Sequence, residues 1–287
     1  TQQDIFEAVG QPMCASVLEG FNGTIFAYGQ TGAGKTFTMQ GVDDGSVSDD
    51  STQGLIPRVF SFLFSRIEEL KAEGVDISCK CSYLEIYNEA VTDLLSDSAS
   101  SITIRDDPKR GVLIEGASTI PVKSAAETTN ALLLGSQNRK VAATCMNKES
   151  SRSHSLFTVY VQAHPLLLRL ALTLTGFRFN LIDLAAGSER QKYTQATGDR
   201  LKEANNINRS LSALGNVIMA LANGNGHVPY RDSKLTFMLK DSIGGNSKTC
   251  IIACCSPAEA CYEETLSTLK FVRFAKLVKN VAVVNQE

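Results

Sequence analysis

The sequence lacks the features of a zinc protein or a membrane protein. No C-x-x-C pair occurs among its eight cysteines, and the three histidines (His154, His164 and His227) stand far apart, so no zinc site is expected. The longest apolar run begins at Leu166, is interrupted by Arg169 and is too short to span a bilayer, so no membrane partner is expected. Reduced thiols in a cytosolic protein are the favoured interpretation of the cysteines.

A strong charge imbalance is also missing. The net charge is −2, which speaks against a nucleic-acid partner, although a local basic face stays compatible with it. With 287 residues, 43% of them apolar, the chain has enough material for one substantial core. It does not begin with Met, and we interpret it as an excised domain of a longer protein.

The stretch from Phe26 to Gly41, FAYGQTGAGKTFTMQG, contains the pattern G-x-x-x-x-G-K-[ST]. Its residues are Gly29, Gln30, Thr31, Gly32, Ala33, Gly34, Lys35 and Thr36. Glycines let backbone N–H groups and a helix N-terminus converge on phosphate oxygens, while Lys35 reaches the β- and γ-phosphates and the Thr36 hydroxyl ligates Mg²⁺. A chance glycine-rich turn is the alternative, but the order strand, loop, helix favours a nucleotide site.

Strand-like and helical patterns mix along the whole chain. The stretches 156–164 and 177–185 predict strands that pair, 102–116 predicts two strands around a turn, and 125–143 and 199–223 predict helices. With no internal repeat, this mixture predicts a three-layer α/β fold of the P-loop NTPase type, with a mostly parallel central sheet and helices on both faces.

Two further motifs separate the classes of P-loop protein. NKESSRSH, from Asn147 to His154, is a polar run with paired serines and an arginine. LIDLAAGSER, from Leu181 to Arg190, is a strand that ends in Asp183, the position at which a carboxylate approaches the metal ion or its waters. A small GTPase is disfavoured because no base-binding N-K-x-D occurs.

These motifs, together with NINRSLSALGNVIMAL and VPYRDSKLTFMLKDSIGGNS, resemble a kinesin motor domain over nearly the whole chain. Details favour the N-terminal-motor subfamilies that act in the mitotic spindle. The resemblance assigns 1–278 to the motor domain and 279–287 to the start of the neck linker. It implies a microtubule-stimulated ATPase with ATP and Mg²⁺ as cofactors.

The resemblance also implies roles for individual residues. Ser151 and Asp183 would join Thr36 at the Mg²⁺ ion, Ser150 would lie near the attacking water, and Asn147 would help to close the phosphate pocket.

The resemblance makes the motifs at 147–154 and 181–190 the first and second switch segments. Between them, Arg152 would pair with Glu189 when a γ-phosphate is present, and Glu189 would relay a proton from the water. Gly187 N–H would contact the γ-phosphate. For Phe37, contact with the adenine ring and ordinary core packing are both open.

A basic segment is the candidate filament surface. From Arg190 to Lys240 the chain carries eight basic and three acidic residues. A solvated face is the usual explanation of such a run. By the resemblance, it would meet the acidic microtubule (tubulin). The residues expected at the contact are Lys109, Arg110, Arg231 and Lys234, whereas Phe237 replaces a basic residue of other members.

The chain departs from the family pattern in three places. A strand carrying R-x-R-P would precede residue 1, and we expect weaker stability and nucleotide binding without it. Three residues separate Asp183 from Gly187 where the family has two, which predicts slowed hydrolysis. The stretch from His164 to Phe177 is apolar where a polar hairpin tip is expected, which predicts an exposed apolar patch.

The leading hypothesis is an ATP-driven microtubule motor domain, located in the cytoplasm on microtubules or the spindle. It would belong to a full-length protein that is dimeric or larger through a stalk. The alternative is a kinesin-like microtubule-binding module with impaired ATP hydrolysis. Cargo, speed and direction are not predicted by this sequence.

Overall fold

The computed structural model describes residues 1–42, 52–96, 101–108, 111–145, 152–165, 176–186 and 199–285. The strands are β1 Gly23–Gly29, β2 Val75–Tyr87, β3 Ala90–Asp93, β4 Thr103–Asp107, β5 Gly111–Glu115, β6 Ile120–Val122, β7 His154–Pro165, β8 Phe177–Asp183 and β9 Lys248–Cys254. The α-helices are α1 Gln2–Ile5, α2 Gln11–Leu18, α3 Lys35–Met39, α4 Leu55–Ala72, α5 Ala125–Cys145, α6 Asp199–Ala222, α7 Lys234–Met238 and α8 Tyr262–Ala275. A π-helical turn, Phe6–Gly10, joins α1 to α2, and 3₁₀ turns precede α7 and α8.

In the described residues the central sheet has seven strands, in the order β3-β2-β7-β8-β1-β9, with β6 beside β2. The prediction of a mostly parallel sheet was wrong. Parallel pairing joins β1 to β8 and to β9, whereas β2 pairs antiparallel with β3, β6 and β7, and β7 with β8. For β2 and β3 a short connection is the reason, because a parallel pair needs a crossover of a dozen or more residues. The β2–β3 turn has only Asn88 and Glu89 between its strands, with φ of 52° and 60°.

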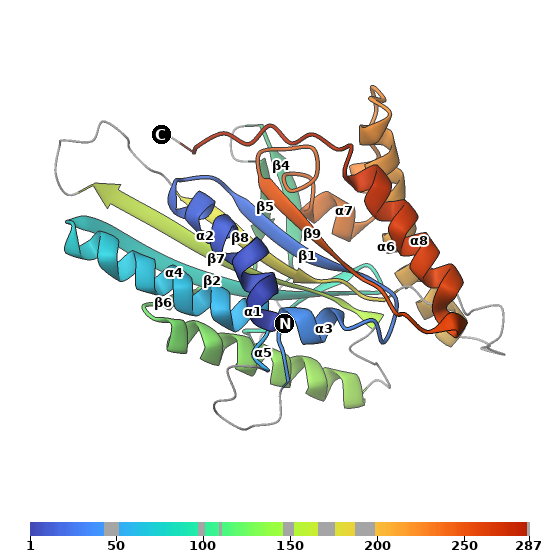
Figure 1. The fold of residues 1–287 in the computed structure, drawn as a ribbon, viewed down its shortest axis with the longest axis horizontal. Coiled ribbons are helices and arrows are strands. Elements are labelled where there is room, and N and C mark those ends of the chain that lie inside the picture. The colour runs from blue at the N-terminus through green and yellow to red at the C-terminus, as the bar shows by residue number, and fades with distance from the viewer. Residues whose placement is uncertain are drawn as a thin grey trace.

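The three-layer α/β architecture is confirmed. Helices α2, α4 and α5 lie on one side of the sheet, and α6 and α8 lie on the other (Figure 1). Successive side chains of β1 point to opposite faces of the sheet, so the strand contributes to both cores. Ile25 and Ala27 join the core under α2 and α4, whereas Phe26 joins the core under α6 and α7. Both cores are therefore anchored on the strand that leads into the glycine-rich loop.

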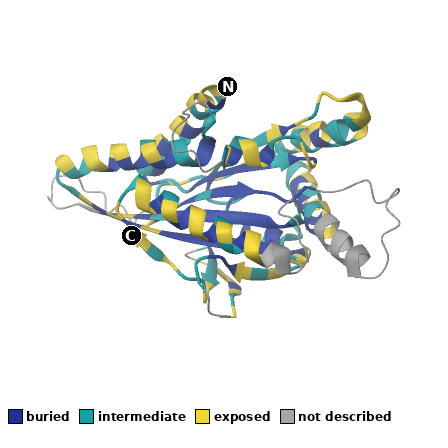
Figure 2. Ribbon diagram, turned by 90° about the horizontal axis from the view of Figure 1, so that it is seen from below, coloured by how far each residue is buried: buried dark blue, intermediate teal, exposed yellow. Residues whose placement is uncertain are grey.

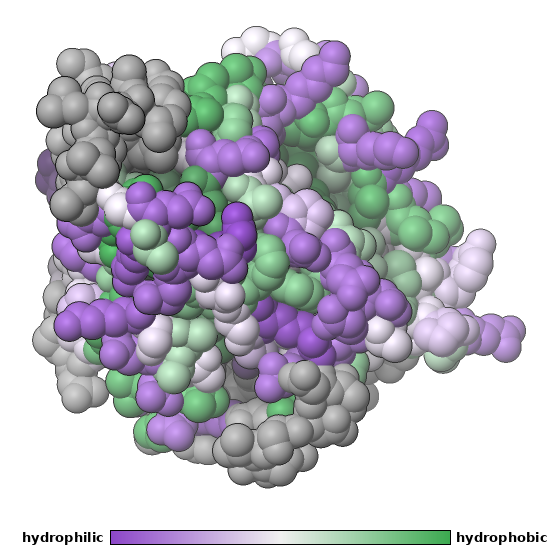
Figure 3. All heavy atoms as spheres, turned by 60° about the vertical axis from the view of Figure 1, so that its left-hand side comes forward, coloured by the Kyte–Doolittle hydropathy of each residue, from purple (hydrophilic) through white to green (hydrophobic). Residues whose placement is uncertain are grey.

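Burial follows these layers closely. The strands are mostly buried, and the helices expose their outer faces (Figure 2). On one face of the molecule, hydrophilic side chains are spread between smaller hydrophobic areas (Figure 3). No helix in the described part of the chain is both long enough and apolar enough to cross a membrane. The apolar stretch from residue 166 to 175 lies outside the described residues, so its predicted exposure is not tested.

Most predicted elements are confirmed. Strands β7 and β8 pair, and β4 and β5 form a hairpin of their own. Cys79 and Cys81 are both buried on one face of β2. All seven cysteines whose side chains are described are free thiols.

Candidate nucleotide site and its switch segments

The glycine-rich loop connects the end of β1 to α3. At Gly29, φ is +154° and a Cβ atom would lie 2.1 Å from the carbonyl oxygen of Cys254, so only glycine fits beside β9. At Gly34, φ is +92° and a Cβ atom would meet nothing within 4 Å. Positive φ, not crowding, thus requires glycine there, and the side of the loop at Gly34 is open to a ligand.

Lys35 is folded back over this loop. Its side chain is buried, and Nζ donates hydrogen bonds to the carbonyl oxygens of Gly29 and Gln30, both at 2.9 Å. Burial lowers the pKa of Lys35, and the charge of Asp183 opposes this shift. The ammonium group is therefore held inside the loop that the motif predicts for phosphate, hydrogen-bonded to two backbone carbonyl groups.

Thr36 and Asp183 come together although 147 positions separate them. Strands β1 and β8 are parallel neighbours, and Ala27 is in register with Asp183, so both strands end at the same edge. Thr36 Oγ1 donates to Asp183 Oδ2 at 2.7 Å. The other carboxylate oxygen, Oδ1, is buried and has no hydrogen-bond partner in the described residues. A hydroxyl and a carboxylate with a spare buried oxygen fit Mg²⁺, which takes oxygen ligands and often only one or two carboxylates.

The remaining predicted catalytic residues are not tested. Asn147, Ser150, Ser151, Gly187 and Glu189 lie outside the described residues.

Two other predicted site residues are described. Arg152 is half-buried just before β7. Phe37 is 50% exposed, which argues against core packing, and its carbonyl oxygen accepts a hydrogen bond from Gln2 Nε2. Contact of its ring with adenine stays a prediction.

The extra residue after Asp183 does not displace the carboxylate. Leu184, Ala185 and Ala186 are all buried, and Asp183 keeps its hydrogen bond to Thr36. The N–H of Ala185 donates to His154 Nδ1 at 2.9 Å. The contact between Asp183 and Thr36 is thus kept despite the extra residue.

Sequence reasoning missed a buried group behind the first switch segment. Arg139 of α5 donates to Glu85 Oε1 of β2 at 3.3 Å, and both side chains are under 10% exposed. The same guanidinium donates to Ser153, to the carbonyl oxygen at 2.7 Å and to Oγ at 2.9 and 3.1 Å. This group fixes the backbone that directly follows Arg152.

His154 is the second missed residue. Its ring is buried between β7, β8 and α6, and its Nε2 lies 2.8 Å from Ser210 Oγ. Burial lowers the pKa of His154 to about 3, and the charges of Arg139 and Lys35 act in the same direction, so the ring is neutral. No local pattern around His154 indicated these two partners, because they lie 31 and 56 positions away in the sequence.

The family model for the kinesin motor domain matches residues 1–281. The chain belongs to the kinesin motor domain family. It is 51% identical to the mouse kinesin-like protein KIF15, over all of this chain and 21% of that protein. It is 52% identical to the Arabidopsis thaliana kinesin-like protein KIN-12E, over all of this chain and 23% of that protein. The chain thus spans about a fifth of the length of these relatives.

Solved structures agree with this family. One reported as a fast kinesin matches with a TM-score of 0.88 at 43% identity, covering all of this chain and 79% of that one. A KIF14 dimer with AMP-PNP in complex with a microtubule matches with a TM-score of 0.86 at 39% identity, covering all of this chain and 80% of that one.

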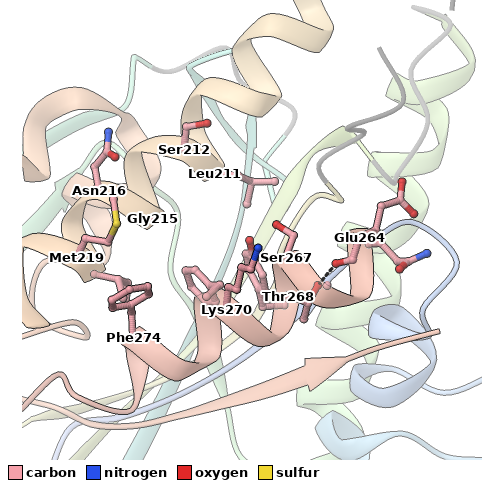
Figure 4. A pocket seen from close by; sticks show the side chains of 15 residues that line it. Leu211, Ser212, Gly215, Asn216, Met219, Glu264, Ser267, Thr268, Lys270 and Phe274 are labelled. Carbon is pink, nitrogen blue, oxygen red and sulfur yellow. Dashed lines mark hydrogen bonds between the residues drawn. The ribbon is translucent and has the colours of Figure 1, made fainter. Parts of the chain in front are cut away.

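In this kinesin motor domain a cavity of about 530 Å³ opens beside the glycine-rich loop. Tyr28, Gly29 and Gln30 line its inner end, and α6 and α8 form its walls. Figure 4 shows the side chains of Asn216 and Met219 on α6 facing those of α8, among them Lys270 and Phe274. The start of the loop is therefore accessible from the gap between these two helices.

The predicted filament residues are partly described. Lys109 and Arg110 lie outside the described residues. Arg231 and Lys234 are exposed, and the Arg231 guanidinium lies 5.3 Å from the centre of the Phe237 ring. Phe237 therefore carries no positive charge itself, but its ring contacts the guanidinium of Arg231.

The hairpin is fastened to the body of this kinesin motor domain next to these residues. Lys240 Nζ lies 2.5 Å from Asp106 Oδ2, and the N–H of Val112 donates to Asp241 Oδ2 at 2.8 Å. The hairpin is thus fixed at both of its strands to the residues that follow α7.

The C-terminal tail is extended, as predicted, and it is hydrogen-bonded. Asn280 Nδ2 donates to the carbonyl oxygens of Ser242 and Ser247 at 2.8 and 2.7 Å, and its Oδ1 accepts from the N–H of Gly244. Further along, the N–H of Asn285 donates to the carbonyl oxygen of Gly20. The tail therefore lies along the body up to residue 285.

Proposed function

We propose that this kinesin motor domain binds and hydrolyses ATP and couples the cycle to microtubule binding. The observation that carries the proposal is the junction of Lys35, Thr36 and Asp183 at the ends of two parallel strands. A mobile cation and a phosphate chain would satisfy the spare oxygen of Asp183 and the buried charge of Lys35.

Within this site each side chain has a distinct task. Lys35 would exchange its two carbonyl partners for phosphate oxygens, and Thr36 and Asp183 would hold Mg²⁺. When bound, Mg²⁺ neutralises charge on the β- and γ-phosphates. Backbone N–H groups around Gly34 would orient the phosphate chain.

The two switch segments would complete the site when ATP is present. Asn147 and Ser150 would bound the pocket and the attacking water, and Ser151 would add a third oxygen ligand. Arg152 would pair with Glu189, which would take up a proton from the water, while Gly187 N–H would contact the γ-phosphate. The fixed backbone at Ser153 supports this proposal, because it gives Arg152 a rigid base.

The partner is a microtubule, consistent with the match to a KIF14 structure in complex with one. Lys109, Arg110, Arg231 and Lys234 would face the acidic filament, and salt would weaken binding. Residues 279–287 would form the start of the neck linker after a motor domain that ends at 278. The full-length protein would be dimeric or larger and would act on cytoplasmic or spindle microtubules, in keeping with its similarity to KIF15 and KIN-12E.

Steady-state ATPase activity with and without microtubules tests this proposal. We expect stimulation of at least about tenfold in the intact chain, and none in Lys35→Ala, which loses the phosphate-binding charge. The control is Lys123→Ala, at an exposed residue remote from the site. A chain that binds ATP and microtubules but shows no stimulation would contradict the proposal.

The extra residue of the second switch favours a second candidate, a microtubule-binding module with impaired hydrolysis. One more residue adds up to about 3.5 Å of chain between Asp183 and Gly187. Because Asp183 stays beside Thr36, the added length would displace Gly187 from the γ-phosphate. Deleting Ala186 should then raise microtubule-stimulated turnover several-fold, whereas unchanged turnover would refute this candidate.

A further inference from the structure

His154 connects three segments that the proposed cycle has to move together. It is the last residue of the NKESSRSH motif and the first residue of β7. Its Nδ1 accepts from the N–H of Ala185, two residues beyond Asp183, and its Nε2 contacts Ser210 Oγ in α6 at 2.8 Å. The side chains of His154 and Ser210 are each 3% exposed, so water does not compete for these bonds.

The two hydrogen bonds fix the state of the ring. Because Nδ1 accepts a hydrogen bond from the N–H of Ala185, the ring hydrogen of neutral His154 is on Nε2, which therefore donates to Ser210 Oγ. The opposite tautomer would place two N–H groups against one another. A single neutral tautomer thus satisfies both neighbours at once.

The ring also has a rigid support. Arg139 holds the carbonyl oxygen of the preceding residue, Ser153, and the following residue, Ser155, is in register with Asp183. With its own backbone fixed, His154 cannot follow Ala185 unless it breaks or bends the bond to Ser210. A displacement of Ala185 would therefore also displace Ser210, and with it α6.

Ser210 occupies a position from which α6 passes a displacement on. Leu214, Val217 and Ile218 follow it on the buried stripe of α6. Helix α6 packs against α7, which begins at Lys234 and follows the turn that contains Arg231. A shift of α6 along its axis would therefore move α7 and change the positions of Arg231 and Lys234 on the surface.

We infer that His154 is a positioning residue that couples the segment after Asp183 to α6 through Ser210, an inference that rests on the proposed function. ATP-dependent movement of the second switch segment reaches the filament face through this ring. If His154 only provided hydrogen bonds to buried polar groups, its replacement would lower stability but would not change the coupling between nucleotide binding and microtubule binding.

Two variants remove the same bond from opposite ends. In His154→Asn, Oδ1 takes the place of Nδ1 and keeps the contact with Ala185, but the side chain is too short to reach Ser210. Ser210→Ala removes the acceptor. Ser212→Ala is the matched control, since Ser212 is exposed on the same helix.

We expect His154→Asn and Ser210→Ala each to lower the microtubule-stimulated kcat about fivefold, the factor that corresponds to one net hydrogen bond. The affinity for ATP and the microtubule concentration at half-stimulation should stay within about twofold of the intact chain. The double variant should be no slower than either single variant, because both remove one interaction.

The inference is wrong if both single variants fold and keep full stimulated kcat, or if their effects multiply in the double variant. If His154→Asn does not fold, Ser210→Ala decides the outcome. Hydrogen exchange of α6 amides, measured with ADP and with AMP-PNP, provides a readout independent of microtubules. A nucleotide-dependent change that persists in Ser210→Ala refutes the coupling, whereas absent stimulation in the intact chain refutes only the proposed function.

Discussion

Replacing Arg139 by methionine removes the cation of a buried ion pair and leaves its carboxylate in place. Arg139 and Glu85 are 7% and 6% exposed, and no solvent would reach the stranded charge of Glu85. Removing one partner of such a pair costs about 3–5 kcal/mol. At roughly 2 °C per kcal/mol for a chain of this size, Arg139→Met should lower the melting temperature by about 6–10 °C.

The double variant Glu85→Met/Arg139→Met gives the reasoning its sharpest test. Two apolar side chains of similar length would fill the same space without a buried charge, so most of the lost stability should return. The carbonyl oxygen and hydroxyl of Ser153 would still lose their donor, which leaves a residual cost of about 1–3 kcal/mol. The single variant should thus be less stable than the double.

Urea titration followed by circular dichroism measures these differences. Arg105→Met is the control, because the Arg105–Glu115 pair has a similar distance of 3.0 Å but side chains that are 66% and 49% exposed. Its cost should stay below about 1 kcal/mol. If Arg139→Met costs no more than this control, or if the double variant is as unstable as the single, the buried pair does not have the energetics argued above.

Three further predictions concern other sites. Gly215→Ala in α6 should raise the free energy of unfolding by about 0.5–1 kcal/mol, since the new Cβ meets nothing within 4 Å. Gly135→Ala in α5 should lower it, since its Cβ would lie 2.2 Å from Tyr83 Cδ1. Shifts of both urea midpoints in the same direction would contradict this pair of predictions. Because the pKa of His154 is lowered to about 3 in the folded chain, the unfolded chain takes up a proton first, and this histidine should remove about 1.4 kcal/mol of stability per pH unit below 6.5. Urea midpoints at several pH values should therefore fall less steeply for His154→Asn, and parallel curves would refute the lowered pKa. Asp183→Asn should weaken the Mg²⁺ dependence of ATP binding in calorimetry, because it removes the charge of the proposed carboxylate ligand. Equal dependence in both chains would exclude Asp183 as a ligand.

Contiguous motifs predicted which two segments meet at the ends of β1 and β8. The loop from Gly29 to Thr36 and the strand end at Asp183 meet as expected, because strand, loop and helix follow one another directly in the sequence. Arg139, Glu85 and Ser153 could not be predicted, since 54 and 14 positions separate the partners and helical periodicity gives a face without naming what it meets.

One signal for the mixed sheet was present in the sequence. In β2, the buried residues Ile77, Cys79 and Cys81 alternate with the exposed residues Asp76, Ser78 and Lys80. A strand of a parallel sheet, covered on both faces, is usually apolar without such alternation. The alternation over the first half of β2 therefore already favoured antiparallel neighbours.

The direction of β7 determines at which edge of the sheet this strand begins. Because β7 runs opposite to β8, the chain enters β7 at the edge where β8 and β1 leave the sheet, and Ser155 is level with Asp183, which is level with Ala27. In an all-parallel arrangement the segment before β7 would emerge at the far edge, about 23 Å away for strands of seven residues. One reversed strand thus brings the start of β7, the end of β8 and the glycine-rich loop after β1 to the same edge of the sheet, where the proposed nucleotide would lie.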